Sequence, residues 1–232
     1  MVATRGEPAS LLGITVWRSF NTGRLYLVIG LVVSAFWAGI LGATDSPTFD
    51  TIVPLLIPVL ANTGTMGGML VFTNDRVKGV LEYLLAYGVS PRRIFMNVLV
   101  ASFVQVSIVT TLAIGAGVTV HFASGYGVDA TFVRATLTYS VPMNFAVAAF
   151  VSTAGMFWTS LSTPRSGMNS PLGLLPLLGI APPGLVLILT EALPGYYFVL
   201  TSGAAVVIAV AAIALIRNLD RLLPRERLLS PA

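Results

Sequence analysis

The stretch from 74 to 95 reads NDRVKGVLEYLLAYGVSPRRIF and contains the longest polar interval of the chain. Apolar residues recur in it at helical spacing, and charged residues lie between them. The apolar set is Val77, Val80, Leu81, Leu84 and Leu85, and the charged set is Asp75, Arg76, Lys78 and Glu82. This pattern predicts an amphipathic helix over 75–88 whose apolar side packs against another surface.

The rest of the chain is strongly apolar. Of its 232 residues 56% are hydrophobic and 9% are charged, with a mean hydropathy of +0.88, whereas a soluble domain carries about 25% charged residues. Because a helix needs roughly 20 apolar residues to cross a bilayer, we predict six spans. The spans are 25–43, 51–73, 95–120, 132–161, 168–189 and 196–216. The predicted fold is one all-α integral membrane domain over 1–232.

Two segments depart from simple spans. Residues 8–22 place Leu11, Ile14, Trp17 and Phe20 opposite Ser10, Arg18 and Asn21, which predicts an N-terminal helix lying in the membrane interface. The fifth span is interrupted by Pro171, Pro176, Pro182 and Pro183, and proline disfavours a straight helix. It is either one kinked span or a span followed by a re-entrant hairpin over 182–193.

The positions of lysine and arginine predict the orientation. Six spans put twelve of the 13 basic residues on one side and leave Arg134 opposite, and positive charge is retained on the cytoplasmic side. Both termini and the 75–88 helix are therefore predicted to be cytoplasmic in a multi-pass plasma-membrane protein. The net charge of +4 then reflects contact with lipid head groups, and we expect no nucleic-acid partner.

Catalytic chemistry has no visible site in the sequence. Between the flanks of each predicted span there is no Asp, Glu, Lys or Arg, and the chain has no cysteine and no G-x-x-x-x-G-K-[ST] phosphate loop. No acidic or histidine cluster has metal-binding spacing. We expect no enzyme activity, cofactor or metal in this chain, and an interfacial role for His121 at the outer edge of the third span.

Several polar residues fall within the predicted spans. They are Asn62, Thr63, Thr65, Gln105, Ser107, Thr110, Thr111 and Asn144. Their first interpretation is hydrogen bonding between helices. The alternative is that Asn62, Thr65, Gln105 and Asn144 contact a substrate on its path.

The 74–95 stretch resembles a motif of the permease subunits of type-2 ABC transporters. Members of that family carry a coupling helix between the second and third of six spans. The residues that stand at the motif positions are Asp75, Arg76, Gly79, Leu81, Glu82, Leu84, Leu85, Ser90, Pro91, Arg92 and Arg93. The order of spans, the interfacial helix and the broken fifth span also resemble this family, although the loop 44–50 is short.

The resemblance implies a permease powered by a separate ATPase. It would pair with a second permease copy, as a homodimer or heterodimer, and dock on two ATPase subunits that bind ATP and Mg²⁺. Coupling would use Asp75, Arg76, Gly79, Leu81, Glu82, Leu84 and Leu85, with Leu81, Leu84 and Leu85 as the apolar anchor in the ATPase. The apolar spans suggest export of an apolar or amphipathic compound.

Three other functions stay open. A haem-exporter-like permease has a similar length and number of spans, but no histidine lies inside a predicted span. A non-transporting scaffold or assembly factor would use the amphipathic helix to bind a cytosolic partner other than an ATPase. A secondary carrier is disfavoured by the uncharged spans.

Overall fold

The computed structural model describes residues 9–161, 203, 206–207, 210–211 and 213–222. In that part of the chain all regular structure is helical. The elements in order are α1 (Ala9–Thr22), α2 (Arg24–Gly42), α3 (Ser46–Leu60), the 3₁₀-helix η1 (Ala61–Thr65), α4 (Met66–Val77), α5 (Val80–Ala86), α6 (Pro91–Ala123), α7 (Ala130–Ala135), the π-helix η2 (Thr136–Ser140), α8 (Val141–Leu161) and α11 (Leu219–Leu222).

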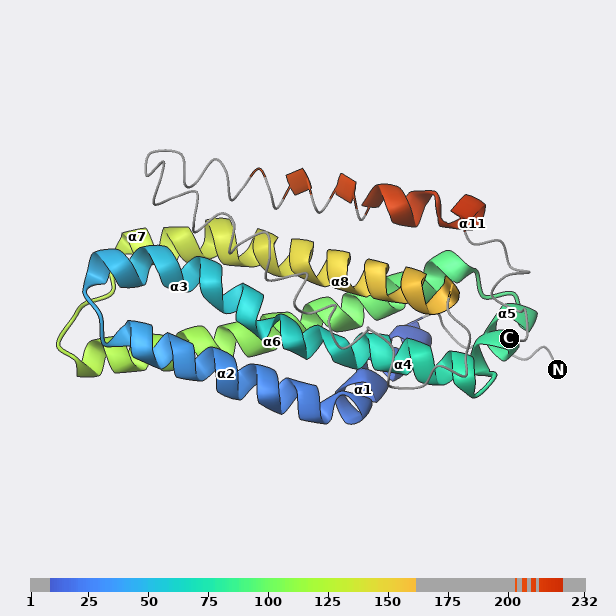
Figure 1. Ribbon diagram of the computed structural model, residues 1–232, viewed down its shortest axis with the longest axis horizontal. Helices are drawn as coiled ribbons and strands as arrows, with labels where there is room; N and C mark the ends of the chain where they lie inside the picture. The colour runs from blue at the N-terminus through green and yellow to red at the C-terminus, as the bar shows by residue number, and fades with distance from the viewer. Residues whose placement is uncertain (1–8, 162–202, 204–205, 208–209, 212, 223–232) are drawn as a thin grey trace.

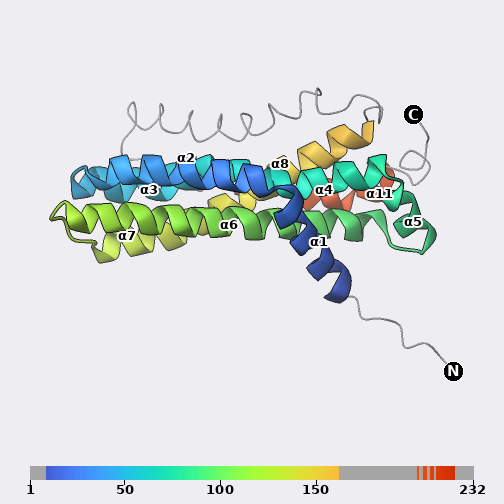
Figure 2. The ribbon, with the colours of Figure 1, turned by 90° about the horizontal axis from the view of Figure 1, so that it is seen from below.

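The long helices form an elongated bundle (Figures 1 and 2). Four stretches are long and apolar enough to cross a membrane: Arg24–Gly42, Ile52–Val77, Pro91–Ala123 and Phe132–Thr153. They coincide with the first four predicted spans, so a multi-pass membrane protein is supported. The predicted fifth span and the 182–193 hairpin lie outside the described residues, and the sixth span is described only in part.

The bundle has two distinct ends, which are named here after the helices that mark them. The α5 end carries α5, α11 and the start of α6, and the α7 end carries α7 and the loop between α2 and α3 (Figure 1). The 33 residues of α6 extend to about 50 Å at 1.5 Å per residue. Since a bilayer core is about 30 Å thick, α6 is longer than one crossing requires.

Small residues let α2 and α6 approach closely. The buried positions of α2 are Gly30, Ser34, Ala38 and Gly42, which recur every four residues and so form one narrow face. A Cβ on Gly117 of α6 would lie 2.8 Å from the carbonyl oxygen of Ala38. The opposite face of α2 exposes large apolar residues such as Phe36 and Trp37, as expected for a surface that faces lipid.

The helix α1 forms over nearly the predicted range, but part of its polar side faces the protein. Ser19 is fully buried, and Arg18 pairs with Asp75 of α4. Ile14 and Trp17 instead point outward. The helix diverges from the bundle axis at its junction with α2 (Figure 2). Arg18 therefore attaches α1 to α4.

A hydrogen bond between spans repairs a break made by proline. Pro58 lacks the N–H that would bond the carbonyl of Pro54 in α3. The hydroxyl of Ser140 donates to that Pro54 oxygen at 2.7 Å in a buried position. Ser140 ends the π-helical segment, one residue before Val141 and two before Pro142. The two irregular spans are thus joined where their own helical bonding is interrupted.

We expect Ser140→Ala to destabilise the chain by about 1 kcal/mol, because the buried Pro54 carbonyl loses its donor. The measurement is the thermal unfolding midpoint in detergent. Thr138→Ala, at an exposed position of the same π-helical segment, is the matched control and should leave the midpoint nearly unchanged. Equal midpoints for the two variants would contradict this role of Ser140.

Candidate partner-binding surface at the α5 end

A left-handed glycine separates α4 from α5. Gly79 has φ of 72°, a conformation that a residue with a Cβ adopts only with strain. Its N–H donates to the carbonyl of Arg76 at 3.2 Å, and its own carbonyl accepts from Tyr83 N–H at 3.3 Å. The predicted helix over 75–88 is therefore too long: Asp75, Arg76 and Val77 end α4, and α5 itself covers only Val80–Ala86.

A second glycine closes the other end of α5. Gly88 has φ of 81° and donates to Leu85 O at 3.1 Å, while Val89 N–H donates to Leu84 O at 3.0 Å. This pair of bonds is the Schellman motif. Ser90 then caps α6, its hydroxyl accepting from Arg93 N–H at 3.3 Å, and Pro91 occupies the first turn. The segment between the two glycines is therefore held at both ends.

The inner face of α5 is part of this chain's own core. Leu81 is 1% exposed and Leu85 is 4% exposed. They belong to an apolar cluster whose other members are Phe72, Ile94, Phe95, Val98, Met156 and Leu219, with Leu84 and Val89 packed against it. The bundle itself covers Leu81 and Leu85, and Leu84 is partly buried, so the role of these three leucines as an anchor for a partner stays a prediction.

The outer face of α5 presents a different set of residues. Tyr83 is 70% exposed and Tyr87 is 84% exposed, and Glu82 and Ala86 beside them are also exposed. Val77 and Lys78 continue the surface at the end of α4. We call Lys78, Glu82, Tyr83, Ala86 and Tyr87 the α5 outer face. Exposed tyrosines provide apolar area together with a hydroxyl, a combination enriched in protein interfaces.

The two tyrosines could have been found in the sequence. At 100° per residue, position 83 lies nearly opposite position 81, and 87 lies nearly opposite 85. Two aromatic residues four positions apart, on the side away from the leucines, form one patch. The sequence interpretation gave the leucines the partner-binding role and did not consider the tyrosines.

Asp75 has an internal partner. Arg18 Nη1 donates to Asp75 Oδ2 at 3.0 Å, and Nη2 donates to Oδ1, so the pair is bidentate. The Asp75 side chain is 10% exposed and that of Arg18 is 33% exposed. Planar bidentate pairing fixes the relative geometry of the two groups. Asp75 therefore attaches α1 to the last turn of α4, just before α5, and it does not belong to the α5 outer face.

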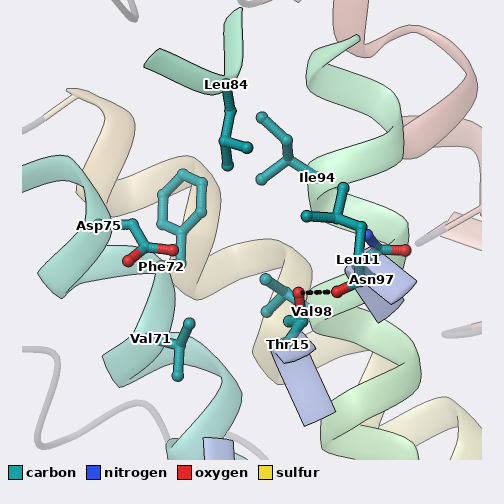
Figure 3. Close-up of a pocket in the computed structure, with 9 residues that line it drawn as sticks. All are labelled: Leu11, Thr15, Val71, Phe72, Asp75, Leu84, Ile94, Asn97 and Val98. Carbon is teal, nitrogen blue, oxygen red and sulfur yellow. Dashed lines mark hydrogen bonds between the residues drawn. The ribbon is translucent and has the colours of Figure 1, made fainter. Parts of the chain in front are cut away.

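A small pocket of about 20 Å³ lies behind this surface, among α1, α4, α5 and α6 (Figure 3). Its lining comprises Leu11, Thr15, Val71, Phe72, Asp75, Leu84, Ile94, Asn97 and Val98. Thr15 donates to Leu11 O at 2.9 Å along its edge. The volume suits about one water molecule, so this pocket is too small for a cofactor. Among the residues described, no group of three or more His, Asp or Glu could hold a metal ion.

Three of the four predicted substrate-path residues, Asn62, Gln105 and Asn144, are buried. Thr110 of α6 donates to Asn144 of α8 at 2.9 Å, which confirms an interhelical bond. Asn62 and Gln105 are 1% and 0% exposed. Neither amide atom of Gln105 has a hydrogen-bond partner among the described residues. The Thr65 side chain lies outside what the structure describes, so the substrate-path role of this set stays a prediction.

His121 at the α7 end is enclosed by protein. It is 0% exposed, and its Nδ1 lies 2.9 Å from the carbonyl of Gly42, so an interfacial position does not describe it.

Nearby, burial raises the pKa of Asp50 above its ordinary value of 3.8, and the charge of Asp129 raises that pKa further, while His121 opposes the shift. The folded state therefore favours the protonated form of Asp50.

This shift gives a pH dependence with a definite sign. The pKa of Asp50 is higher in the folded state than in the unfolded state. The contribution of Asp50 to the free energy of unfolding is therefore highest below pH 3.8, where the carboxyl is protonated in both states, and it falls as the pH rises through the folded-state pKa. We expect Asp50→Asn to raise the unfolding midpoint at pH 7 and to leave it unchanged near pH 3.5. Asp45→Asn, at an exposed position, is the control and should change neither. A midpoint at pH 7 that is lowered in Asp50→Asn would contradict the assignment.

Comparison of the chain with protein-family models, with curated proteins and with solved structures finds no match.

Proposed function

We propose that this chain is the membrane-spanning permease subunit of an ATP-driven transporter of the type-2 ABC class. It acts with a second permease copy and two separate ATPase subunits, and it exports an apolar or amphipathic compound. The observation that carries the proposal is the α5 outer face, an exposed aromatic and acidic surface on a short helix fixed at the end of the spans.

The proposed orientation places the α5 end in the cytoplasm. The described basic residues on the α5 side are Arg18, Arg24, Arg76, Lys78, Arg92, Arg93, Arg217 and Arg221, and the α7 end carries Arg134. Positive charge is retained on the cytoplasmic side of a membrane. With six spans, both termini are cytoplasmic as well, and the α5 outer face meets cytosolic proteins.

The α5 outer face suits a protein partner with an apolar groove and a basic rim. Tyr83 and Tyr87 would enter the groove as anchors, and the exposed Glu82 would pair with a basic side chain or with a helix N-terminus of the partner. Leu81 and Leu85 hold α5 against α4, α6 and α8. A displacement of α5 by the partner would therefore pass directly to the second, third and fourth spans.

The choice of an ATPase as the partner rests on what the spans lack. Within Arg24–Gly42, Pro91–Ala123 and Phe132–Thr153 no charged residue lies at mid-span. The charged residues of these stretches, including Arg134, lie close to an end. Ion-coupled carriers keep ionisable groups inside the membrane. A chain without them needs an external source of energy for transport, and ATP hydrolysis in a docked subunit supplies it. The same apolar spans favour an apolar or amphipathic substrate.

The test is purification of the full chain from its native membrane in mild detergent, with mass spectrometry of the proteins that remain bound. Recovery of a phosphate-loop ATPase in comparable molar amount supports the proposal. Recovery of a different cytosolic protein would replace it with the scaffold function. Recovery of no bound protein would leave α5 as a membrane-surface element and overturn the proposal.

A further inference from the structure

Four rings are stacked in series at the α7 end of the bundle. In order they are Tyr126, His121, Phe49 and Phe132, with centroid separations of 5.0, 4.1 and 4.9 Å and interplanar angles of 19°, 8° and 17°. We call this series the ring stack. Phe49 and His121 are fully buried, and Phe132 is nearly so.

The local sequence explains half of the ring stack. Gly125 has φ of 86° and its N–H donates to Phe122 O at 3.0 Å, while Tyr126 N–H donates to His121 O at 3.1 Å. These bonds form a Schellman motif at the end of α6, in which the side chains of the two outer residues commonly touch. Here those residues are His121 and Tyr126, so their stacking is set by the end of the helix.

The other half belongs to different helices. Phe49 lies on α3 and Phe132 on α7. Both pack in an apolar cluster with Val53 and Ile57 of α3, Ala38 of α2, and Ala113 and Ile114 of α6. His121 also binds the last carbonyl of α2 through Nδ1 at 2.9 Å from Gly42 O. The contact between His121 and Phe49 therefore joins a unit made of α2, α6 and the Gly125 turn to a unit made of α3 and α7.

We infer that the ring stack is a latch that keeps the α7 end of the bundle closed, and that it opens by separating His121 from Phe49. This inference rests on the proposed function, because an exporter must open the end opposite its ATPase to release substrate. When the latch opens, Tyr126 stays stacked on His121 and Phe132 stays stacked on Phe49, and the central contact breaks together with the packing of the apolar cluster across it. Such a device gives two discrete states of the kind that transporters alternate between.

The chain has one histidine, so a histidine reagent reports on the latch alone. Diethyl pyrocarbonate acylates neutral imidazole that solvent can reach, and mass spectrometry locates the modified peptide. With the full chain in its native membrane at pH 7, we expect slow modification of His121. Phe49→Leu and, separately, Phe49→Met should each speed the modification about fivefold, since about 1 kcal/mol of stacking between Phe49 and His121 is lost.

Phe122→Leu is the matched control. Phe122 is adjacent to His121 on α6 but is 58% exposed and outside the ring stack, so its loss should leave the rate unchanged. Fast modification of the unaltered chain, or equal rates in all variants, would overturn the latch. The two test variants guard against a single one that fails to fold, since the flexible methionine side chain fills much of the space that the ring leaves.

A second arm separates the latch from the proposed function. If an ATPase co-purifies, trapping the complex with ATP and vanadate should speed the modification of His121 in the unaltered chain, and an unchanged rate would refute the role of the latch in transport. If no ATPase binds, the transporter proposal fails. The comparison of Phe49→Leu with Phe122→Leu in the isolated chain still decides whether the ring stack closes this end.

Discussion

Replacing Tyr83 and Tyr87 together by serine is expected to release the cytosolic partner while the chain stays folded. The two rings are the largest exposed groups of the α5 outer face, and a buried tyrosine anchor typically contributes about 2 kcal/mol or more to binding. Loss of two anchors should weaken binding at least about 100-fold. The measurement is the dissociation constant of the purified chain in nanodiscs with the proposed ATPase subunit, alongside the unfolding midpoint.

The opposite face of the same helix provides the control. Leu81→Ala should destabilise the chain by about 2–4 kcal/mol, because it opens a cavity in the cluster around Phe72 and Phe95. The folded fraction should bind the partner with an unchanged dissociation constant. If the tyrosine variant bound normally and Leu81→Ala did not, the partner would contact the inner face and the α5 outer face would be wrongly assigned.

Gly23→Ala is expected to produce the largest loss of stability from a single added methyl group. A Cβ at Gly23 would overlap the Cα of Gly67 and lie 2.9 Å from Ser19 O. These neighbours are backbone atoms, so no side-chain rotation relieves the overlap, and the α1–α2 junction must separate from α4. Overpacking of this kind costs about 3 kcal/mol, which thermal or denaturant unfolding in detergent would measure.

The same substitution on α1 should have the opposite sign. Gly13 is exposed, and a Cβ there would meet no atom within 4 Å. Because alanine favours a helix over glycine by up to about 1 kcal/mol, Gly13→Ala should be neutral or slightly stabilising. A Gly23→Ala variant as stable as Gly13→Ala would show that α1 and α2 do not cross α4 at the glycine pair.

Helix boundaries were predicted best where the sequence carries local signals. The first span was expected over 25–43 and is observed at Arg24–Gly42. The third was expected to begin at 95, but Ser90 and Pro91 start the helix four residues earlier. Both residues were noted in the sequence as part of a family motif, and their capping chemistry was not used to place the helix end.

The amphipathic pattern of α5 predicted a buried face but not what buries it. Periodicity indicates only that one side of a helix is covered. Here the cover comes from the flanking helices α4 and α6 and from two residues distant in sequence, Met156 of α8 and Leu219. The ring stack was hidden for the same reason. His121, Phe49 and Phe132 lie far apart in the chain, so only the tertiary fold brings their rings together.

The two positive-φ glycines that bound α5 also fix its rotational phase. Between Gly79 and Gly88 the helix has room for one arrangement in which the leucines face the bundle and the tyrosines face away. One residue inserted after Glu82 would turn all that follows by about 100° relative to Leu81, so Leu81 and Leu85 could not both stay buried. The residue count of this segment therefore specifies which face of α5 is exposed.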